Sequence, residues 1–327
     1  MSSNATSDEV MPIYNYEDPT SLVASLLMIL NGFFGVTCNS LIVYIFLKEK
    51  KERSAFNVIC VVRAIVNIYV LVTNHLGLFV PMTLTGKDLF SKNLQTWAIC
   101  MSNSLYMANE YLTVVIAINR FISLFFPLYY SKLCGMKPTL GIVIVMYAYR
   151  IGKVTQETID YTALNCSVLY YIDFLSWTPD FSPECESNSG LLLFISINFG
   201  IVSLFNIATF AKIIMFYRNQ RREDRESRKR IKKNVYLFVQ TLLQDSLYLI
   251  DISFTFYFFN FYPSRLWTFF CGTFIWQSLH SFDGFIMIMF NERLSFIKKQ
   301  LFDPLASKVT FVRPSQVSTT ANSIANS

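Results

Sequence analysis

Seven long apolar segments constrain this chain more than any other feature of its sequence. A helix that crosses the hydrocarbon core of a bilayer needs about 20 mostly apolar residues. Segments that approach or exceed this length lie at 22–47, 55–80, 97–126, 139–155, 191–217, 234–261 and 266–290. Since backbone polar groups inside a bilayer must be satisfied within the protein, each segment is predicted to be a helix. We therefore predict an all-α membrane protein with a seven-transmembrane helix bundle.

Composition and charge agree with a membrane protein. Of 327 residues, 53% are hydrophobic and only 15% are charged, which is too apolar for a soluble domain of this size. The net charge of +6 comes from short basic segments between the apolar runs, including nine Lys and Arg residues between Arg218 and Lys233. This clustering follows the positive-inside rule, so the predicted partner is a lipid membrane and not a nucleic acid.

The charges also predict an orientation. Residues 1–21 contain four acids and no Lys or Arg. The loops rich in Lys and Arg are expected on the opposite side of the membrane from this segment. We expect 1–21 to be extracellular, 22–290 to form the seven-helix bundle and 291–327 to be cytoplasmic. Two glycosylation sequons, at Asn4 and Asn165, then both fall outside the cell, where glycosylation takes place.

The fourth apolar segment is the weakest. Only 139–149, about 11 residues, is cleanly apolar, whereas a span needs about 17 or more. Arg150 and Lys153 follow, so this segment spans only if both side chains extend outward to the membrane surface. The alternative is a non-signalling protein from an incomplete or decaying gene.

The segment after the seventh span changes character. Between 291 and 302, apolar residues at 294, 297 and 301 alternate with basic ones, which predicts a short interfacial helix on the inner leaflet. The remaining residues to 327 are rich in Ser, Thr and Asn and are predicted to be disordered. All ten prolines are expected to lie in loops, tails or at helix ends, so that no helix carries a proline kink.

The third segment ends in a pattern of its own. Asn119, Arg120 and Phe121 are followed by Pro127 and Leu128, with Pro127 seven residues after Arg120. An arginine at the end of an apolar helix can offer five donors to a partner at the membrane face. Proline then ends the helix, because it lacks an N–H group and restricts the residue before it.

This pattern resembles the inner end of the third helix of rhodopsin-like G-protein-coupled receptors, where Asp/Glu-Arg-Tyr is followed at the same distance by Pro-Leu. Here Asn119 replaces the acid and Phe121 the tyrosine. Three stretches are similar to the nematode serpentine receptor class x family, whose members are chemosensory receptors. They are FNVICVVRAIVN (56–67), AINRF (117–121) and FDGFIMIMFNERL (282–294).

The resemblance, which covers about 31–294, implies a function. A small ligand would bind in the outer half of the bundle and open an inner cleft for a heterotrimeric G protein. The coupling residues would then be Asn119, Arg120, Phe121, Pro127 and Leu128. The resemblance also implies the plasma membrane, in sensory neuron cilia, as the location.

No pattern in the sequence predicts an enzyme. The chain has no nucleophile elbow, zinc-protease motif or phosphate loop. His75 and His280 are the only histidines, and the seven cysteines include no CxxC pair. We therefore predict no catalytic residues, no metal site and no cofactor.

Polar residues inside the apolar segments are the candidate functional residues. Arg63 lies about nine residues, or about 14 Å, from the inner end of the second segment. A charge at this depth costs about 2.5 to 3.5 kcal/mol and should be paired, here with Asp283 or Glu110. Residues expected in the same depth band are Asn39, Asn67, Glu110 and Asp283. A switch between two packings and a static assembly pair both fit this cluster.

A second polar group lies nearer the outer side and is a candidate ligand pocket. Its members are Asn103, Tyr106, Asp251, Trp276, Gln277 and His280. Apolar walls with a few placed polar groups are typical of small-molecule sites, although each residue alone also fits a hydrogen bond between helices. A ligand-gated channel or transporter is the alternative function, since charge inside a membrane also marks ion pathways.

The outer cysteines complete the predictions. Cys100, Cys166 and Cys185 are expected on the oxidising side, where two of the three should form a disulfide. We favour a bridge between Cys166 and Cys185, because it closes a loop of about 20 residues and should stabilise the fold by about 3 kcal/mol. A bridge from Cys100 to either of the others is the alternative.

Overall fold

The computed structural model describes residues 15–48, 54–179, 185, 190–218 and 225–290, with backbone alone at 190–192, 217 and 225–233. The sequon at Asn4, the interfacial helix predicted at 291–302 and the tail to 327 lie outside the described residues. So do nearly all side chains of the basic run 218–233.

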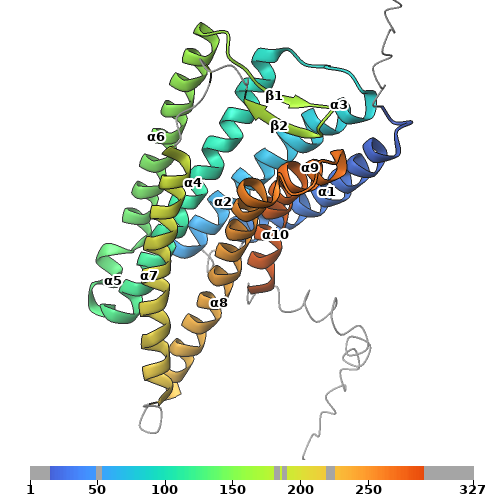
Figure 1. Ribbon diagram of the computed structural model, residues 1–327. Helices are drawn as coiled ribbons and strands as arrows, with labels where there is room; N and C mark the ends of the chain where they lie inside the picture. Colours follow the sequence, from blue (N-terminus) through green and yellow to red (C-terminus); the bar gives the residue numbers. More distant parts are fainter. Residues whose placement is uncertain (1–14, 49–53, 180–184, 186–189, 219–224, 291–327) are drawn as a thin grey trace, which may run out of the picture. The chain divides into compact units, whose positions relative to one another are not determined.

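The described chain is a bundle of long helical segments that run in alternating directions (Figure 1). The first five helical elements are α1 (Pro19–Lys48), α2 (Ala55–Val70), η2 (Leu71–Phe79), α3 (Val80–Thr85) and α4 (Lys92–Phe125). Next come α5 (Pro127–Leu133), α6 (Met136–Ala163), α7 (Gly190–Arg218), α8 (Arg225–Ser253) and η5 (Phe254–Phe258). The last three are α9 (Arg265–Phe269), η6 (Phe270–Phe274) and α10 (Ile275–Phe290).

Apart from the short α5, these elements form the seven helical segments expected from the sequence, because α2, η2 and α3 are continuous, as are α8 with η5 and α9 through α10. Within the described residues, three helices meet the length and apolarity of a membrane span: Pro19–Lys48, Ala55–Thr85 and Leu193–Phe216. In α4, buried polar side chains such as Asn109, Glu110 and Arg120 interrupt the apolar sequence.

Two ends of the bundle are distinguished by what they carry. One end carries a small β-hairpin made of β1 (Val168–Tyr171) and β2 (Ser176–Pro179), and we call it the hairpin end. The other carries the short helix α5, and we call it the α5 end (Figure 1). The hairpin strands are antiparallel, with Val168 opposite Pro179 and Tyr171 opposite Ser176.

The hairpin is packed into the hairpin end of the bundle. Tyr170 stacks on Phe79 with ring centroids 4.3 Å apart, and its hydroxyl shares a hydrogen bond of 2.8 Å with Thr83. Leu175 has a positive φ of 52°, a strained backbone for a residue with a Cβ. Burial of its side chain and a hydrogen bond of 2.7 Å from Thr273 to its carbonyl hold it there.

The disulfide joins Cys166 to Cys185, with their Cα atoms 5.5 Å apart, as favoured from the sequence. Cys100 is a free thiol on α4, so the alternative pairings are excluded in this structure. Asn165, the second sequon residue, is exposed immediately before the bridge and has a positive φ of 54°. Asparagine adopts this conformation more readily than most residues.

The fourth segment forms the helix α6, which is 28 residues long but is not among the described helices apolar enough for a membrane span. Whether it spans stays a prediction. Arg150 contacts α4, where its Nη2 lies 3.0 Å from Met107 Sδ and its Nε donates to the Ser104 carbonyl at 3.4 Å. Lys153 is exposed and pairs with Glu157 at 3.7 Å along the helix. Contacts with α4 therefore accommodate Arg150.

Pro81 corrects a sequence prediction, because it lies inside a helical segment and not at its end. The segment continues past Pro81 to Thr85. Proline has no N–H to offer the carbonyl one turn earlier, and the wider turns of η2 precede it, with the Val80 N–H bonded to the His75 carbonyl. The segments that contain η5 and η6 have similar wide turns without a proline.

Candidate functional site

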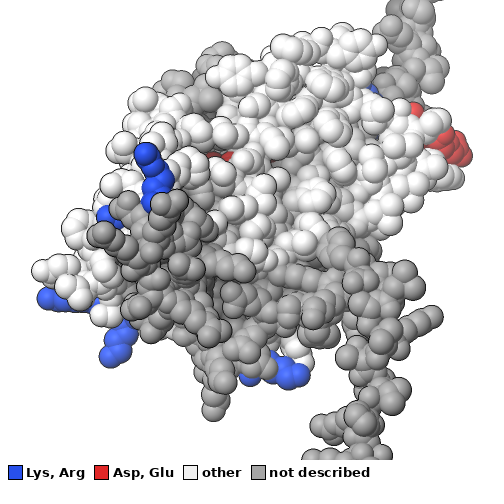
Figure 2. Space-filling model, turned by 90° about the horizontal axis from the view of Figure 1, so that it is seen from below, with Lys and Arg blue, Asp and Glu red and all other residues white. Residues whose placement is uncertain are grey.

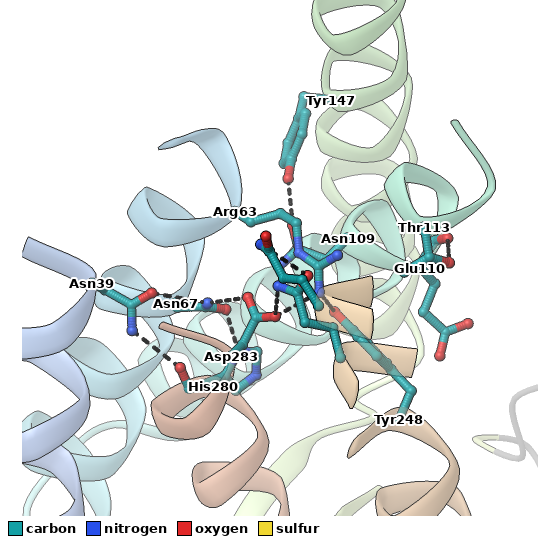
Figure 3. Close-up of polar contacts among 12 residues, drawn as sticks. Asn39, Arg63, Asn67, Asn109, Glu110, Thr113, Tyr147, Tyr248, His280 and Asp283 are labelled. Carbon is teal, nitrogen blue, oxygen red and sulfur yellow. Dashed lines mark hydrogen bonds and ion pairs between the residues drawn. The ribbon is translucent and has the colours of Figure 1, made fainter. Parts of the chain in front are cut away.

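A buried carboxylate on α10 is the centre of the candidate site. Asp283 accepts hydrogen bonds from Arg63 Nη2 at 2.8 Å, Asn67 Nδ2 at 2.8 Å and Gln244 Nε2 at 2.7 Å. The side chains of Arg63 and Asp283 are each only 1% exposed. Three helical segments, α2, α8 and α10, therefore meet at one carboxylate (Figure 3).

The contacts extend to α1 through two amides. Asn67 Nδ2 also donates to Asn39 Oδ1 at 3.1 Å, and Asn39 Nδ2 donates to the His280 carbonyl at 3.1 Å. His280 Nδ1 lies 2.8 Å from Asn67 Oδ1, which can only accept, so the ring proton is on Nδ1. A side chain at Gly284 would collide with Asn39, since a Cβ there would lie 2.5 Å from its Nδ2.

We call this set the Asp283 network and define it by its members: Asn39, Arg63, Asn67, Gln244, Tyr248, His280 and Asp283. Four of them, Asn39, Arg63, Asn67 and Asp283, were predicted as one cluster from depth alone. Gln244 and Tyr248 were not placed there. Gln244 lies ten residues, or about 15 Å, into its predicted segment, which matches the depth of Arg63 and could have identified it.

Burial makes the ion pair costly to break. Desolvating two charges costs several kcal/mol each, and this is offset only when the remaining donors and acceptors are satisfied. Asp283 has three donors, and Arg63 Nη2 also reaches the Tyr248 hydroxyl at 3.4 Å, with the guanidinium 5.6 Å from the centre of that ring. Arg63 Nε and Nη1 have no hydrogen-bond partner among the described residues, so the pair with Asp283 is its main compensation. The network therefore ties helices together.

Glu110, the remaining member of the predicted cluster, does not join it. The sequence left open whether Arg63 pairs with Asp283 or with Glu110, and the structure pairs it with Asp283. Glu110 lies on α4 with its carboxyl group turned away from Arg63 (Figure 3). The two carboxylates, although similar in depth, therefore face different surroundings.

The predicted coupling residues lie at the α5 end, and Arg120 requires a correction. Its side chain is buried and donates from Nη1 to Thr241 Oγ1 of α8, so the guanidinium is not held at the membrane face. It also lies 5.6 Å from the centre of the Phe56 ring. Among the described residues no carboxylate pairs with it, and a hydroxyl and an aromatic face take that place.

The neighbours of Arg120 end the helix as predicted. Helix α4 stops at Phe125, and Pro127 is the first residue of α5. Asn119 accepts a hydrogen bond of 3.2 Å from the Tyr130 hydroxyl, which ties α5 to α4. Phe121 stacks on Phe125, with centroids 4.3 Å apart.

One of the predicted coupling residues is almost fully exposed. Leu128, at the start of α5, is 90% exposed. A leucine this exposed at the end of a bundle offers an apolar contact to whatever approaches the α5 end.

Comparison with known proteins identifies the family. Residues 29–291 match the family described as serpentine type 7TM GPCR chemoreceptor Srx. The chain belongs to this family. It is also similar to serpentine receptor class X 45 of Caenorhabditis elegans, with 24% identity over 302 residues that cover 83% of this chain and 79% of the relative. The chain is therefore a multi-pass membrane protein of a receptor class, and not an enzyme.

In this Srx receptor, most of the predicted ligand-pocket residues contact one another or the backbone. Tyr106 donates to Asp251 Oδ2 at 2.9 Å, and Gln277 Nε2 donates to the Met28 carbonyl at 2.7 Å. Trp276 is buried, with its ring 5.4 Å from that of Trp177 in the hairpin. These side chains fill the hairpin end of the core.

The other two predicted pocket residues have different positions. His280 is part of the Asp283 network, as described above. Asn103 is half-buried on α4. A ligand role for the six residues therefore stays a prediction.

A cavity does lie between α4, α7 and α8. Its polar lining residues are Glu110, Thr113, Asn198, Asp245 and Tyr248. Its apolar lining residues are Ile195, Phe199, Val202, Leu249 and Ile252. We call it the α7–α8 cavity. Only Glu110 among the predicted site residues lines it.

Proposed function

We propose that this chain is a G-protein-coupled chemoreceptor of the plasma membrane, with the hairpin end outside the cell and the α5 end inside. A small ligand would change the packing of the helices and open a cleft at the α5 end for a heterotrimeric G protein. Membership of the Srx family supports this proposal. A ligand can favour the open packing only by binding it more tightly than the closed packing.

The contact between Arg120 and Thr241 carries the coupling part of the proposal. It joins α4 to α8 at the α5 end. Thr241 accepts a hydrogen bond from the buried Arg120 guanidinium, which a G protein would need to reach. A hydrogen bond to a charged group contributes about 1.5 to 3 kcal/mol. Breaking this one contact is therefore enough to shift a balance between closed and open packings by about tenfold or more.

The distribution of charge supports the orientation. Figure 2, a view from below Figure 1 and so from the side of the α5 end, shows Lys and Arg side chains (blue) at several places on the described surface and most of the visible acids (red) at one edge. Exposed basic residues on elements that reach this end are Lys48, Lys132, Lys137 and Arg218. Basic residues favour the cytoplasmic side of a membrane.

The Asp283 network is the element that we propose to differ between the two packings. It joins α1, α2, α8 and α10, so a rotation of α8 would change the partners of Gln244 and Tyr248. The same helix carries Thr241 at the α5 end. Ligand binding and coupling would thus act through one moving helix.

The test compares variants at both ends of the Arg120 contact. Arg120→Ala should reduce nucleotide exchange on a reconstituted G protein to background, while surface level, measured through an amino-terminal tag, stays close to that of the unmodified receptor. Thr241→Ala should raise exchange without ligand about tenfold, because Arg120 loses its partner on α8.

Ser246→Ala is the matched control, since this hydroxyl on the same helix bonds only to its own backbone, at Leu242. Unchanged exchange in Arg120→Ala, at normal surface level, would show that Arg120 is not the coupling residue. Equal rises in Thr241→Ala and Ser246→Ala would show that the α4 contact does not restrain the receptor.

A further inference from the structure

Glu110 is a buried acid without a visible counter-charge. Its side chain is 5% exposed, and within the described residues its Oε1 atom has no hydrogen-bond partner. It lines the α7–α8 cavity, on the far side from Asp283 (Figure 3). An unpartnered carboxyl oxygen in an apolar setting costs free energy that a bound donor would recover.

A second acid lines the same cavity from another helix. Asp245, on α8, accepts a hydrogen bond of 3.0 Å from Asn206 of α7. No Lys or Arg in the described chain forms an ion pair with either Glu110 or Asp245. Arg63 is committed to Asp283 at 2.8 Å. The cavity thus has two acids and no basic group of its own.

Apart from Thr113, Asn198 and Tyr248, the remaining walls are apolar and reach the surface of the bundle. Val202 and Ile195 are buried, whereas Phe199 of α7 and Leu249 of α8 are exposed on the outside. In a membrane that outside surface contacts acyl chains. The enclosed volume is only about 30 Å³, enough for a small polar head group, and the rest of the space is open to the outside of the bundle.

We propose that the α7–α8 cavity binds an amphiphilic amine, with its ammonium group between Glu110 and Asp245 and its apolar part against Phe199 and Leu249. An ammonium group supplies three donors and would form a direct ion pair with two acids that have none among the described residues. The apolar part enters from the bilayer between α7 and α8. This inference rests on the proposed receptor function and adds the class of ligand and its site.

The cavity adjoins both parts of the proposed switch. Tyr248 forms part of its wall and accepts a hydrogen bond of 3.4 Å from Arg63, so an occupant touches the Asp283 network directly. Asp245 lies one helical turn from Thr241, the partner of Arg120. Filling the cavity therefore acts on the helix that holds Arg120.

The experiment uses the full-length receptor in nanodiscs of zwitterionic lipid, without a G protein. The probes are octylamine, which is an ammonium ion at neutral pH, octanol and octanoate. Radiolabelled probe bound above empty nanodiscs is measured together with the thermal unfolding midpoint. We expect saturable octylamine binding and a raised midpoint, and neither effect with octanol or octanoate.

Variants of the cavity residues test whether octylamine binds in the α7–α8 cavity. Glu110→Gln and Asp245→Asn should each weaken octylamine binding at least tenfold, and Val202→Phe should block it by filling the cavity. Asp18→Asn is the control, an acid that pairs with Arg265 and does not line the cavity, and it should bind normally. Each variant is compared only if its midpoint without probe shows a folded receptor; Val202→Phe leaves both acids intact and so tests the site independently.

The outcomes separate this inference from the proposed function. Equal binding of octylamine by the receptor and by Glu110→Gln, or equal binding of octanol, would overturn the amine site even if other ligands drive nucleotide exchange. Site-dependent octylamine binding without exchange on any G protein would retain the amine site and reject the coupling proposal.

Discussion

The second helical segment, made of α2, η2 and α3, and the helix α7 are almost equally apolar, yet they differ in how much of each is buried. Their most apolar 18-residue windows have mean hydropathies of 2.1 and 1.9, but 61% of the first window is buried and only 17% of the second. The second segment carries Arg63 and Asn67 of the Asp283 network. Helix α7 instead borders the cavity and faces outward. Hydropathy therefore identifies both as membrane helices but does not show which one is enclosed by protein.

This difference suggests a division of roles. The side formed by α1, the second segment and α10 holds polar groups that are costly to disturb, so it fixes the fold. The α7 side has fewer buried groups and an open cavity, so its packing can change at lower cost. The predictions below test this comparison.

The largest effect is expected at the centre of the packed side. Asp283→Ala removes the acceptor shared by three donors and leaves Arg63 as an uncompensated buried charge, which should cost about 3 to 5 kcal/mol. Asp245→Ala on the cavity side leaves only the Asn206 donor unpaired and should cost about 1 kcal/mol. Thermal unfolding in nanodiscs measures both, and equal losses would remove the distinction between the two sides.

A matched pair of apolar substitutions gives the next effect. Leu71, in η2, is 0% exposed, and Leu71→Ala should cost about 2 to 5 kcal/mol through lost contacts and a cavity. Leu204, on α7, is 67% exposed, and Leu204→Ala should change stability by less than about 0.5 kcal/mol. If the two losses in unfolding midpoint are similar, α7 is packed against something that the isolated chain does not contain.

The disulfide tests whether the hairpin belongs to the packed side. Replacing Cys166 and Cys185 together by serine should cost about 3 kcal/mol, because the bridge closes a loop across a sequence separation of 19. Cys100→Ser is the control, since this thiol is free. If the double variant loses much less stability than about 3 kcal/mol, the packing of Tyr170 against Phe79 and Thr83 is enough to hold the hairpin in place.

The smallest effect is expected where α1 begins. Burial alone would raise the pKa of Asp18, but hydrogen bonds from the Ser21 backbone and hydroxyl and from Arg265 outweigh it and lower the pKa below 3.8. A lowered folded-state pKa stabilises the protein above the unfolded pKa, and this contribution is lost as pH falls through the folded value.

Asp18→Asn keeps a good helix cap but removes the ion pair with Arg265, so it should cost less than about 1 kcal/mol at neutral pH. The gap between the two proteins in unfolding midpoint should narrow as pH falls below about 4. A gap that grows on acidification would contradict the ion-pair explanation.

Several features follow from the sequence because they depend on local chemistry or on depth alone. Apolar length predicted the seven segments, and the missing N–H of Pro127 placed the end of α4 at Phe125. The cost of a buried charge required Arg63 to have a partner at its own depth, which made Asp283 a candidate. The short loop between Cys166 and Cys185 favoured their pairing over a bridge to Cys100.

Other features were decided by the tertiary structure, because they depend on how each helix is rotated about its axis and on which helix lies beside it. Depth could not tell Asp283 from Glu110, and only the packing of α4 turns Glu110 toward the α7–α8 cavity. The same packing turns Arg120 inward to Thr241 and gives Arg150 its contacts with α4. Such contacts join residues far apart in sequence, so no local pattern records them.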